Sequence, residues 1–222
     1  MTKYPDLIKK FKDKGNLELA LTHRSWVNEH KNSRRSNERL EFLGDAILEF
    51  VVSEVIYNKF PNQEEGYLTA LRAKIVNTVS LAAIAIKLDL GPHIFLSKGE
   101  EDTGGRTNNS LLADTVESII GAIFIDRGLA ESRKFIEENI LDNLDEISNE
   151  PLKDPKSLLQ EEVQAKGYST PKYVVVKEEG PDHEKTFTLE VVVDGNKLGS
   201  GTGKSKSEAA QNAAKDALSK SL

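Results

Sequence analysis

The sequence predicts two domains: an all-α N-terminal domain, followed by a small α+β domain with the element order α-β-β-β-α. Residues 1–147 show helical periodicity, with capping residues, glycines and prolines where helices should end. Beyond residue 155, apolar and mostly polar residues alternate with the period of two that is typical of strands. The polar, proline-containing stretch 148–154 is expected to be a linker, so the predicted domains are 1–147 and 155–222.

Six helices are expected in the first domain. They cover residues 5–14, 16–22, 38–58, 66–88, 109–126 and 130–147, and either Ser36 or Asn37 is expected to cap the third. The polar segments 23–36 and 97–109 are expected to be loops.

In the second domain, the predicted elements begin with a helix over 156–166 and strands over 172–178 and 185–194. Asp194-Gly195-Asn196 is a hairpin turn signal. It predicts a third, short strand, after which a helix begins at about Ser205.

The composition limits the functional classes. The 222 residues include no cysteine, which excludes disulfides and cysteine-based zinc sites. The lack of cysteine makes a reducing cytoplasm the expected location. Since no apolar run approaches the roughly 20 residues that span a bilayer, we expect no membrane partner. The net charge of −6 argues mildly against a nucleic-acid partner, so charge must be assessed locally.

The stretch GSGTGKSKSEAA (199–210) looks like a nucleotide phosphate loop, but its spacing is wrong. Leu198 stands where the first glycine belongs, and only 17 residues follow Ser205, too few for a nucleotide-binding sheet. We therefore expect no nucleotide cofactor. Lys204 and Lys206 at a helix start can instead hold the phosphates of a nucleic-acid backbone. The alternative is a simple turn with solvated lysines.

The stretch NERLEFLGDAILEF (37–50) places Glu38, Glu41 and Asp45 in one narrow sector of a helix. Clustered carboxylates repel one another and are tolerated where a hard divalent cation offsets their charge. Glu38, like Glu65 near the start of the 66–88 helix, is also explained by ordinary helix-dipole complementation.

The other side of the same helix is expected to face the core. Its apolar stripe is Leu40, Leu43, Ile47 and Phe50. Gly44 disfavours a helix, which suggests that another backbone packs closely against it.

Asp114 and Glu117 lie in a predominantly apolar helix, and buried acids are rare unless they are paired or metal-bound. Together with Glu41 and Asp45 they predict a magnesium site that serves phosphoryl chemistry. The alternative for Asp114 is an ion pair with Arg72 or Lys74. His23 is a weak candidate for a general base and is better explained as ordering the 23–36 segment.

These residues resemble a known family. NERLEFLGDA is similar to the signature of ribonuclease III, ALTHRSWVNE (20–29) to the element before it, and LLADTVESIIGAIFID to its second acidic helix. The C-terminal part resembles a double-stranded RNA-binding domain. Its matching pieces are PKSLLQEEVQ (155–164), Tyr173, GPDH (180–183) and GTGKSKSEAAQNAA (201–214).

The resemblance implies an endoribonuclease that cuts both strands of duplex RNA, leaving 5′-phosphate and 3′-hydroxyl ends with short 3′ overhangs. It implies a homodimer through the N-terminal domain, Mg²⁺ as cofactor with Mn²⁺ as a substitute, and a role in processing rRNA and mRNA precursors. Glu41, Asp45, Asp114 and Glu117 match the family's metal-binding and catalytic acids, and Glu38 and Glu65 match auxiliary acids. Asp45 is expected to orient the attacking water, and Glu117 to be a ligand whose loss harms turnover more than RNA binding.

The resemblance also implies the RNA contacts of the second domain. Gln160 and Glu161 would reach 2′-hydroxyls, His183 the next minor groove, and Lys204 and Lys206 the phosphates across the major groove. Ser207 and Ala210 stand where the family usually has lysines, and residues 152–222 carry 11 Lys against 11 Asp and Glu. Weaker RNA affinity is therefore expected. The alternative function is a duplex-RNA-binding regulator that does not cleave.

Overall fold

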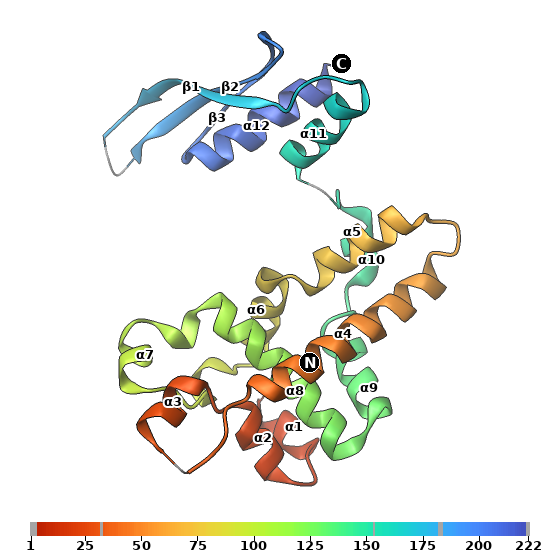
Figure 1. The fold of residues 1–222 in the computed structure, drawn as a ribbon, viewed down its shortest axis with the longest axis vertical. Coiled ribbons are helices and arrows are strands. Elements are labelled where there is room, and N and C mark those ends of the chain that lie inside the picture. The colour runs from red at the N-terminus through yellow and green to blue at the C-terminus, as the bar shows by residue number, and fades with distance from the viewer. Residues whose placement is uncertain (1–3, 32, 153, 182–183, 221–222) are drawn as a thin grey trace. The chain divides into compact units, whose positions relative to one another are not determined.

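The computed structural model describes all residues except 1–3, 32, 153, 182–183 and 221–222. It divides into two compact units, residues 1–150 and 151–222 (Figure 1). The first unit is helical, and the second is a three-stranded antiparallel sheet with two helices. The predicted fold class is therefore confirmed.

The helical unit is built around α8. Its helices are α1 (Tyr4–Lys9), α2 (Lys14–Ala20), α3 (Arg24–Glu29), α4 (Glu38–Lys59), α5 (Glu65–Val76), α6 (Thr78–Lys87), α7 (Lys98–Asp102), α8 (Asn109–Arg127), α9 (Leu129–Asn139) and α10 (Leu144–Asn149), with 3₁₀ turns at Gly91–His93 and Gly105–Thr107. Helix α8 lies among the other helices of this unit (Figure 1) and contacts α2, α4, α6 and α9. Most of its side chains are buried. It is the core helix of this unit.

Several predicted boundaries in this unit are wrong. The single helix expected over 66–88 is two helices, because Asn77 is extended and caps α6 by accepting a hydrogen bond from the Ser80 backbone N–H at 2.9 Å. The helix expected over 130–147 is likewise divided into α9 and α10, and the one over 5–14 ends at Lys9. The expected loops contain short helices, α3 and α7.

Two glycines allow α4 and α8 to cross at close range, as Gly44 predicted. A Cβ atom on Gly44 would lie 1.8 Å from the backbone oxygen of Glu117, and one on Gly121 would lie 2.2 Å from that of Leu40. No larger residue fits either position without moving backbone, so these glycines set the spacing of the two helices.

The predicted core stripe of α4 is only partly correct. Leu40 and Ile47 are buried, but Phe50 is 55% exposed. Periodicity alone could not distinguish a residue that faces the core from one on an exposed apolar face.

The second unit packs two helices against one sheet. Its elements are α11 (Pro155–Ala165), β1 (Lys172–Glu179), β2 (Thr186–Val193), β3 (Asn196–Gly203) and α12 (Lys206–Ser219), with the strand order β1-β2-β3. The core joins side chains of both helices to β2: Leu159, Val163, Val191, Val193, Ala213, Ala214 and Ala217. The predicted hairpin turn is confirmed, since Asp194 and Gly195 between β2 and β3 both have positive φ.

The lengths and compositions of the helices bear on a membrane location over the described ranges. No single helix there is long and apolar enough to cross a bilayer, and only α5 and α6 together, bent by 42°, reach that length and composition.

Candidate metal centre and nucleic-acid interface

Three carboxylates from two helices meet where α4 crosses α8. Each of Glu41, Asp114 and Glu117 offers one oxygen, and these three oxygens lie within 4.8 Å of one another. All three residues are partly buried. The backbone contact between Gly44 and Glu117 lies beside this cluster, so the close helix crossing is what brings the acids together.

The starts of both helices are held in place by asparagines. Asn108 caps α8 by accepting hydrogen bonds from the backbone N–H groups of Ser110 and Leu111 at 2.9 and 3.2 Å. Asn37 occupies the cap position of α4, but its buried side chain instead donates to the Ala20 carbonyl at 3.2 Å. The predicted cap position is therefore confirmed at Asn37, but this residue makes no side-chain capping hydrogen bond and instead anchors α4 to α2.

Burial and mutual repulsion disfavour ionisation of the cluster. Burial, followed by repulsion from Asp45, Asp114 and Glu41, raises the pKa of Glu117 to about 8. Burial is also the largest cause that raises the pKa of Glu41 and of Asp114 above their usual values. A bound divalent cation would remove both penalties by compensating the charge.

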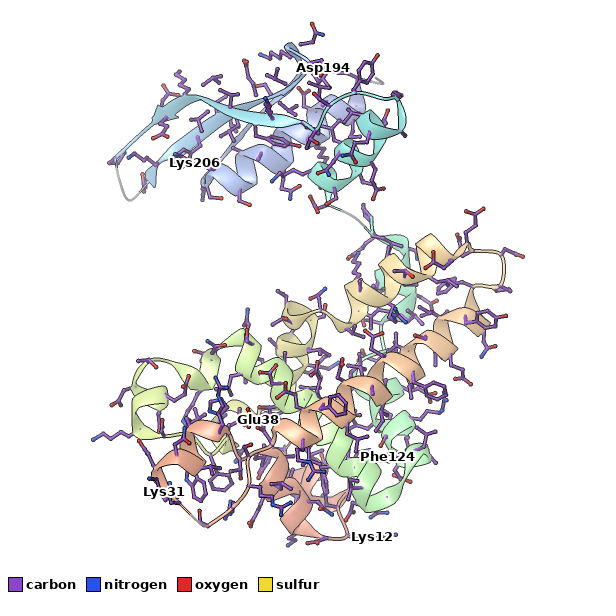
Figure 2. All side chains as sticks on the ribbon, viewed as in Figure 1. Lys12, Lys31, Glu38, Phe124, Asp194 and Lys206 are labelled. Carbon is purple, nitrogen blue, oxygen red and sulfur yellow. The ribbon has the colours of Figure 1, made fainter. Side chains whose placement is uncertain are left out.

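The other predicted acids occupy different places. Asp45 is exposed and lies one helical turn beyond Glu41, near enough to raise the pKa of Glu117 but outside the group of three. Glu38 is the first residue of α4 (Figure 2). Its carboxylate accepts a hydrogen bond from the Ser36 hydroxyl at 2.6 Å and lies 3.8 Å from the Arg24 guanidinium.

Glu65 lies apart from this cluster, in the first turn of α5. It accepts a hydrogen bond from the Thr69 hydroxyl at 2.9 Å and lines a pocket with Ser53, Tyr57 and Leu68. The structure does not bring it among the ligand oxygens of Glu41, Asp114 and Glu117.

His23 caps α3. Its Nδ1 accepts a hydrogen bond from the Ser25 backbone N–H at 3.3 Å and lies 2.8 Å from the Ser25 hydroxyl, which in turn accepts from the Ser97 N–H. Burial lowers the pKa of His23 below its usual value. These contacts support the interpretation that His23 orders the segment after it.

The cations considered as partners of Asp114 are engaged elsewhere. Arg72 lies 2.9 Å from Glu49, and Lys74 lies 2.8 Å from Glu150. Sequence reasoning missed Glu49, which also contributes to the raised pKa of Glu117. Glu49 follows Asp45 by four residues and so continues the acidic sector of α4. This spacing could have identified Glu49 from the sequence.

A polar pocket of about 370 Å³ opens beside Asp114. Side chains from α3, α7 and the start of α8 line it, among them His23, Asn28, Glu100, Asn108 and Ser110. Of these neighbours, sequence reasoning had singled out His23. It missed Asn28, Glu100 and Asn108, which come from segments expected to be loops, and Ser110, which lies in the first turn of α8.

The predicted RNA-binding residues of the second unit are exposed where they are described. Gln160 and Glu161 lie on α11, and Lys204 lies in the turn from β3 into α12. Lys206 is the first residue of α12 (Figure 2). His183 lies outside the described residues.

The glycines of the GSGTGKS stretch lie in β3, directly before this turn, and are required there for packing. Cβ atoms on Gly199, Gly201 and Gly203 would lie 2.5, 2.1 and 2.6 Å from backbone atoms of α12. The glycines therefore allow α12 to pack directly on β3 and lead into the helix start, where Ser205 accepts a hydrogen bond from the Glu208 N–H at 3.1 Å.

Comparison with known proteins agrees with both units. Residues 13–144 match the family model described as Ribonuclease-III-like, and residues 155–221 match the double-stranded RNA binding motif. The chain is 48% identical to "Ribonuclease 3" of Natranaerobius thermophilus over 201 residues, which is 90% of this chain and 87% of that protein. It is 47% identical to "Ribonuclease 3" of Enterococcus faecalis, over 94% of this chain and 91% of that one.

Solved structures give the same relationship for the helical unit. The nuclease domain of ribonuclease III from Campylobacter jejuni aligns with a TM-score of 0.57 and 43% identity, covering 64% of this chain and 97% of that domain. A second structure of that nuclease domain, whose subject is flexibility in the region involved in dimer formation, aligns with a TM-score of 0.55 and 44% identity, covering 61% and 96%. The chain therefore belongs to the ribonuclease III family of endoribonucleases.

Proposed function

We propose that this endoribonuclease is magnesium-dependent, acts as a homodimer and cuts both strands of duplex RNA in rRNA and mRNA precursors. The proposed products carry 5′-phosphate and 3′-hydroxyl ends with short 3′ overhangs. The observation that carries this proposal is the convergence of Glu41, Asp114 and Glu117 within 4.8 Å.

The donor set fits Mg²⁺. Among the described residues, the three ligands that meet here are all carboxylates, which favour a hard cation. Burial, followed by repulsion from neighbouring acids, raises the pKa of Glu117, and both effects favour binding of a cation that offsets the charge. Mg²⁺ bound there would supply charge stabilisation at the scissile phosphate and lower the pKa of a bound water. Mn²⁺ takes the same oxygen ligands and is the expected substitute.

Side chains of the helical unit would bind the cation and orient the attacking water. Glu41, Asp114 and Glu117 would hold the cation, and the rigid crossing of α4 and α8 would keep their geometry fixed. Asp45 lies at the exposed margin of the cluster and is the group we assign to orienting the attacking water. Glu38, beside Arg24 at the start of α4, would act as an auxiliary acid.

RNA recognition would rest on the second unit. Gln160 and Glu161 on α11 would contact minor-groove 2′-hydroxyls, and Lys204 and Lys206 would contact phosphates across the major groove. This mode of binding follows the shape of A-form RNA rather than its sequence.

An exposed apolar face on α4 supports dimerisation through the helical unit. Phe42, Phe50 and Tyr57 are 81%, 55% and 69% exposed, and their spacing of eight and seven residues puts them on one side of the helix. Large apolar side chains exposed together are typical of interaction surfaces. The Campylobacter jejuni nuclease domain also has a region involved in dimer formation.

The test incubates long duplex RNA and Mg²⁺ with one of three proteins: wild type, Glu117→Gln or Glu137→Gln. Glu137→Gln is the control, because it changes an exposed acid on α9. Binding is measured separately in EDTA. We expect wild type and Glu137→Gln to cut, and Glu117→Gln to bind normally but cut roughly 10²-fold more slowly or worse.

Other results would change the proposal. Equal cutting by Glu117→Gln would remove this acid from the site, and wild-type binding without cutting would identify a non-cleaving regulator. Equal cutting of duplex DNA would contradict recognition through 2′-hydroxyls.

A further inference from the structure

Two lysines and two carboxylates meet at the start of α12. Lys206 Nζ lies 3.1 Å from Glu178 Oε1, and the Lys204 backbone N–H donates to Glu208 Oε2 at 2.7 Å. The charges of this group, which we call the α12 corner, therefore balance. This local balance matters because the corner is where RNA phosphates are expected to bind.

The two carboxylates serve different purposes. Glu208 stabilises the helix start, since its backbone N–H donates to the cap residue Ser205 and its carboxylate accepts from the Lys204 backbone N–H. Its removal would weaken the helix start. Glu178 lies on the edge strand β1 with its side chain 38% exposed, and at the corner it forms an ion pair with Lys206.

Sheet register explains why Glu178 reaches Lys206. Glu178 is paired with Phe187 on β2, and Phe187 is paired with Gly203 on β3, so the three residues form one row across the sheet. Three residues after Gly203, the chain enters α12 and places Lys206 Nζ 5.4 Å from the centre of the Phe187 ring. The carboxylate and the ammonium group thus meet at the end of this row.

The helix start has little freedom to move away from this row. A Cβ atom on Gly203 would lie 2.6 Å from the Ala209 backbone nitrogen, which shows how closely α12 packs on the end of β3. The position of Lys206 beside Glu178 is therefore a consequence of the fold.

We infer that Glu178 limits the RNA affinity of this protein by competing with a backbone phosphate for Lys206. The inference rests on the proposed contact between Lys206 and RNA. A phosphate that takes Lys206 must displace the Glu178 carboxylate and then lies near its negative charge. An exposed ion pair is weak, so Glu178 reduces affinity without preventing binding.

The experiment compares Glu178→Gln with Glu179→Gln in the full-length chain. Glu179 is the neighbouring residue, and the same change there removes the same charge from an ion pair with Lys177 at 2.8 Å. Binding of a short RNA duplex is followed by fluorescence anisotropy over a series of salt concentrations. The buffer contains EDTA, and thermal unfolding confirms that each variant is folded.

We expect Glu178→Gln to bind RNA roughly two- to fivefold more tightly than wild type, with a salt slope steeper by up to about one phosphate contact. Glu179→Gln should change affinity less. Lys206→Ala should weaken binding, and Glu178→Gln should give no gain when Lys206→Ala is already present. This loss of the gain would show that Glu178 acts through Lys206.

The contrary results separate the inference from the proposed function. The inference would be overturned by any of three results: an equal gain in RNA affinity from Glu179→Gln, no gain from Glu178→Gln, or a gain from Glu178→Gln that persists when Lys206→Ala is present. In each of these cases, weaker binding by Lys206→Ala alone would still support the RNA contact. If Lys206→Ala changed neither affinity nor salt slope, the proposed contact itself would be wrong, and the inference with it.

Discussion

Glu117 is the residue on which burial, charge and the proposed chemistry converge. It lies in a largely buried helix, and four neighbouring carboxylates raise its pKa in addition to burial. The sequence revealed this residue because an acid in an apolar helix needs an explanation. It did not reveal Lys206's partner, because Glu178 comes from a distant strand and is placed there only by the sheet register.

The raised pKa of Glu117 makes the stability of the metal-free protein depend on pH. The folded-state pKa of about 8 exceeds the usual value of 4.5, so the folded protein retains a proton that the unfolded chain releases. The contribution to stability is complete below about pH 4.5 and is lost as pH rises through 8.

We therefore expect the thermal midpoint of wild type in EDTA to fall relative to that of Glu117→Gln between pH 5 and pH 8.5. Thermal unfolding of both proteins across this range measures the difference. A difference that stays constant with pH would show that Glu117 is ionised as readily in the fold as in the unfolded chain.

At the scale of elements, the crossing of α4 and α8 was predictable in part. Gly44 within an otherwise regular helix indicated a close backbone, and the structure places the Glu117 carbonyl there. The break at Asn77 was not predicted, since the apolar pattern continues through it and only the cap to Ser80 marks the new helix. Helix α3 and helix α7 were missed because short polar segments carry little periodic signal.

Gly44→Ala is expected to destabilise the protein by about 1–3 kcal/mol and to weaken the metal site, because the new methyl group would force α4 away from α8. Denaturant unfolding and Mg²⁺ titration measure the two effects. Gly66→Ala is the matched control: it lies in α5 with no atom within 4 Å of its Cβ position, and should be neutral or slightly stabilising. Equal behaviour of the two variants would mean that the glycine does not set the helix spacing.

At the scale of the whole molecule, the sequence predicted the fold class and the domain order, but not which apolar residues would remain exposed. Phe50 belongs to the same periodic pattern as core residues, yet together with Phe42 and Tyr57 it stays exposed on the single chain. The periodic pattern of one sequence does not distinguish apolar residues that the chain itself buries from those that a partner subunit would cover. The proposed homodimer accounts for this face.

Phe42→Asp should shift the protein from dimer to monomer, because a carboxylate would have to be buried in the proposed interface. Sedimentation velocity measures the change, and RNA cleavage should fall with it. Val176→Asp, at an exposed apolar residue of the second unit, should leave the dimer intact. If Val176→Asp dissociated the dimer and Phe42→Asp did not, the interface would lie outside the helical unit.

The most direct test of the proposed metal centre is anomalous diffraction from crystals soaked in Mn²⁺, which locates the ion without relying on activity. We expect a peak bonded to carboxylate oxygens of Glu41, Asp114 and Glu117 at roughly 2.0–2.2 Å, as hard divalent ions require. A peak bound elsewhere, with these three carboxylates uncoordinated, would contradict the account.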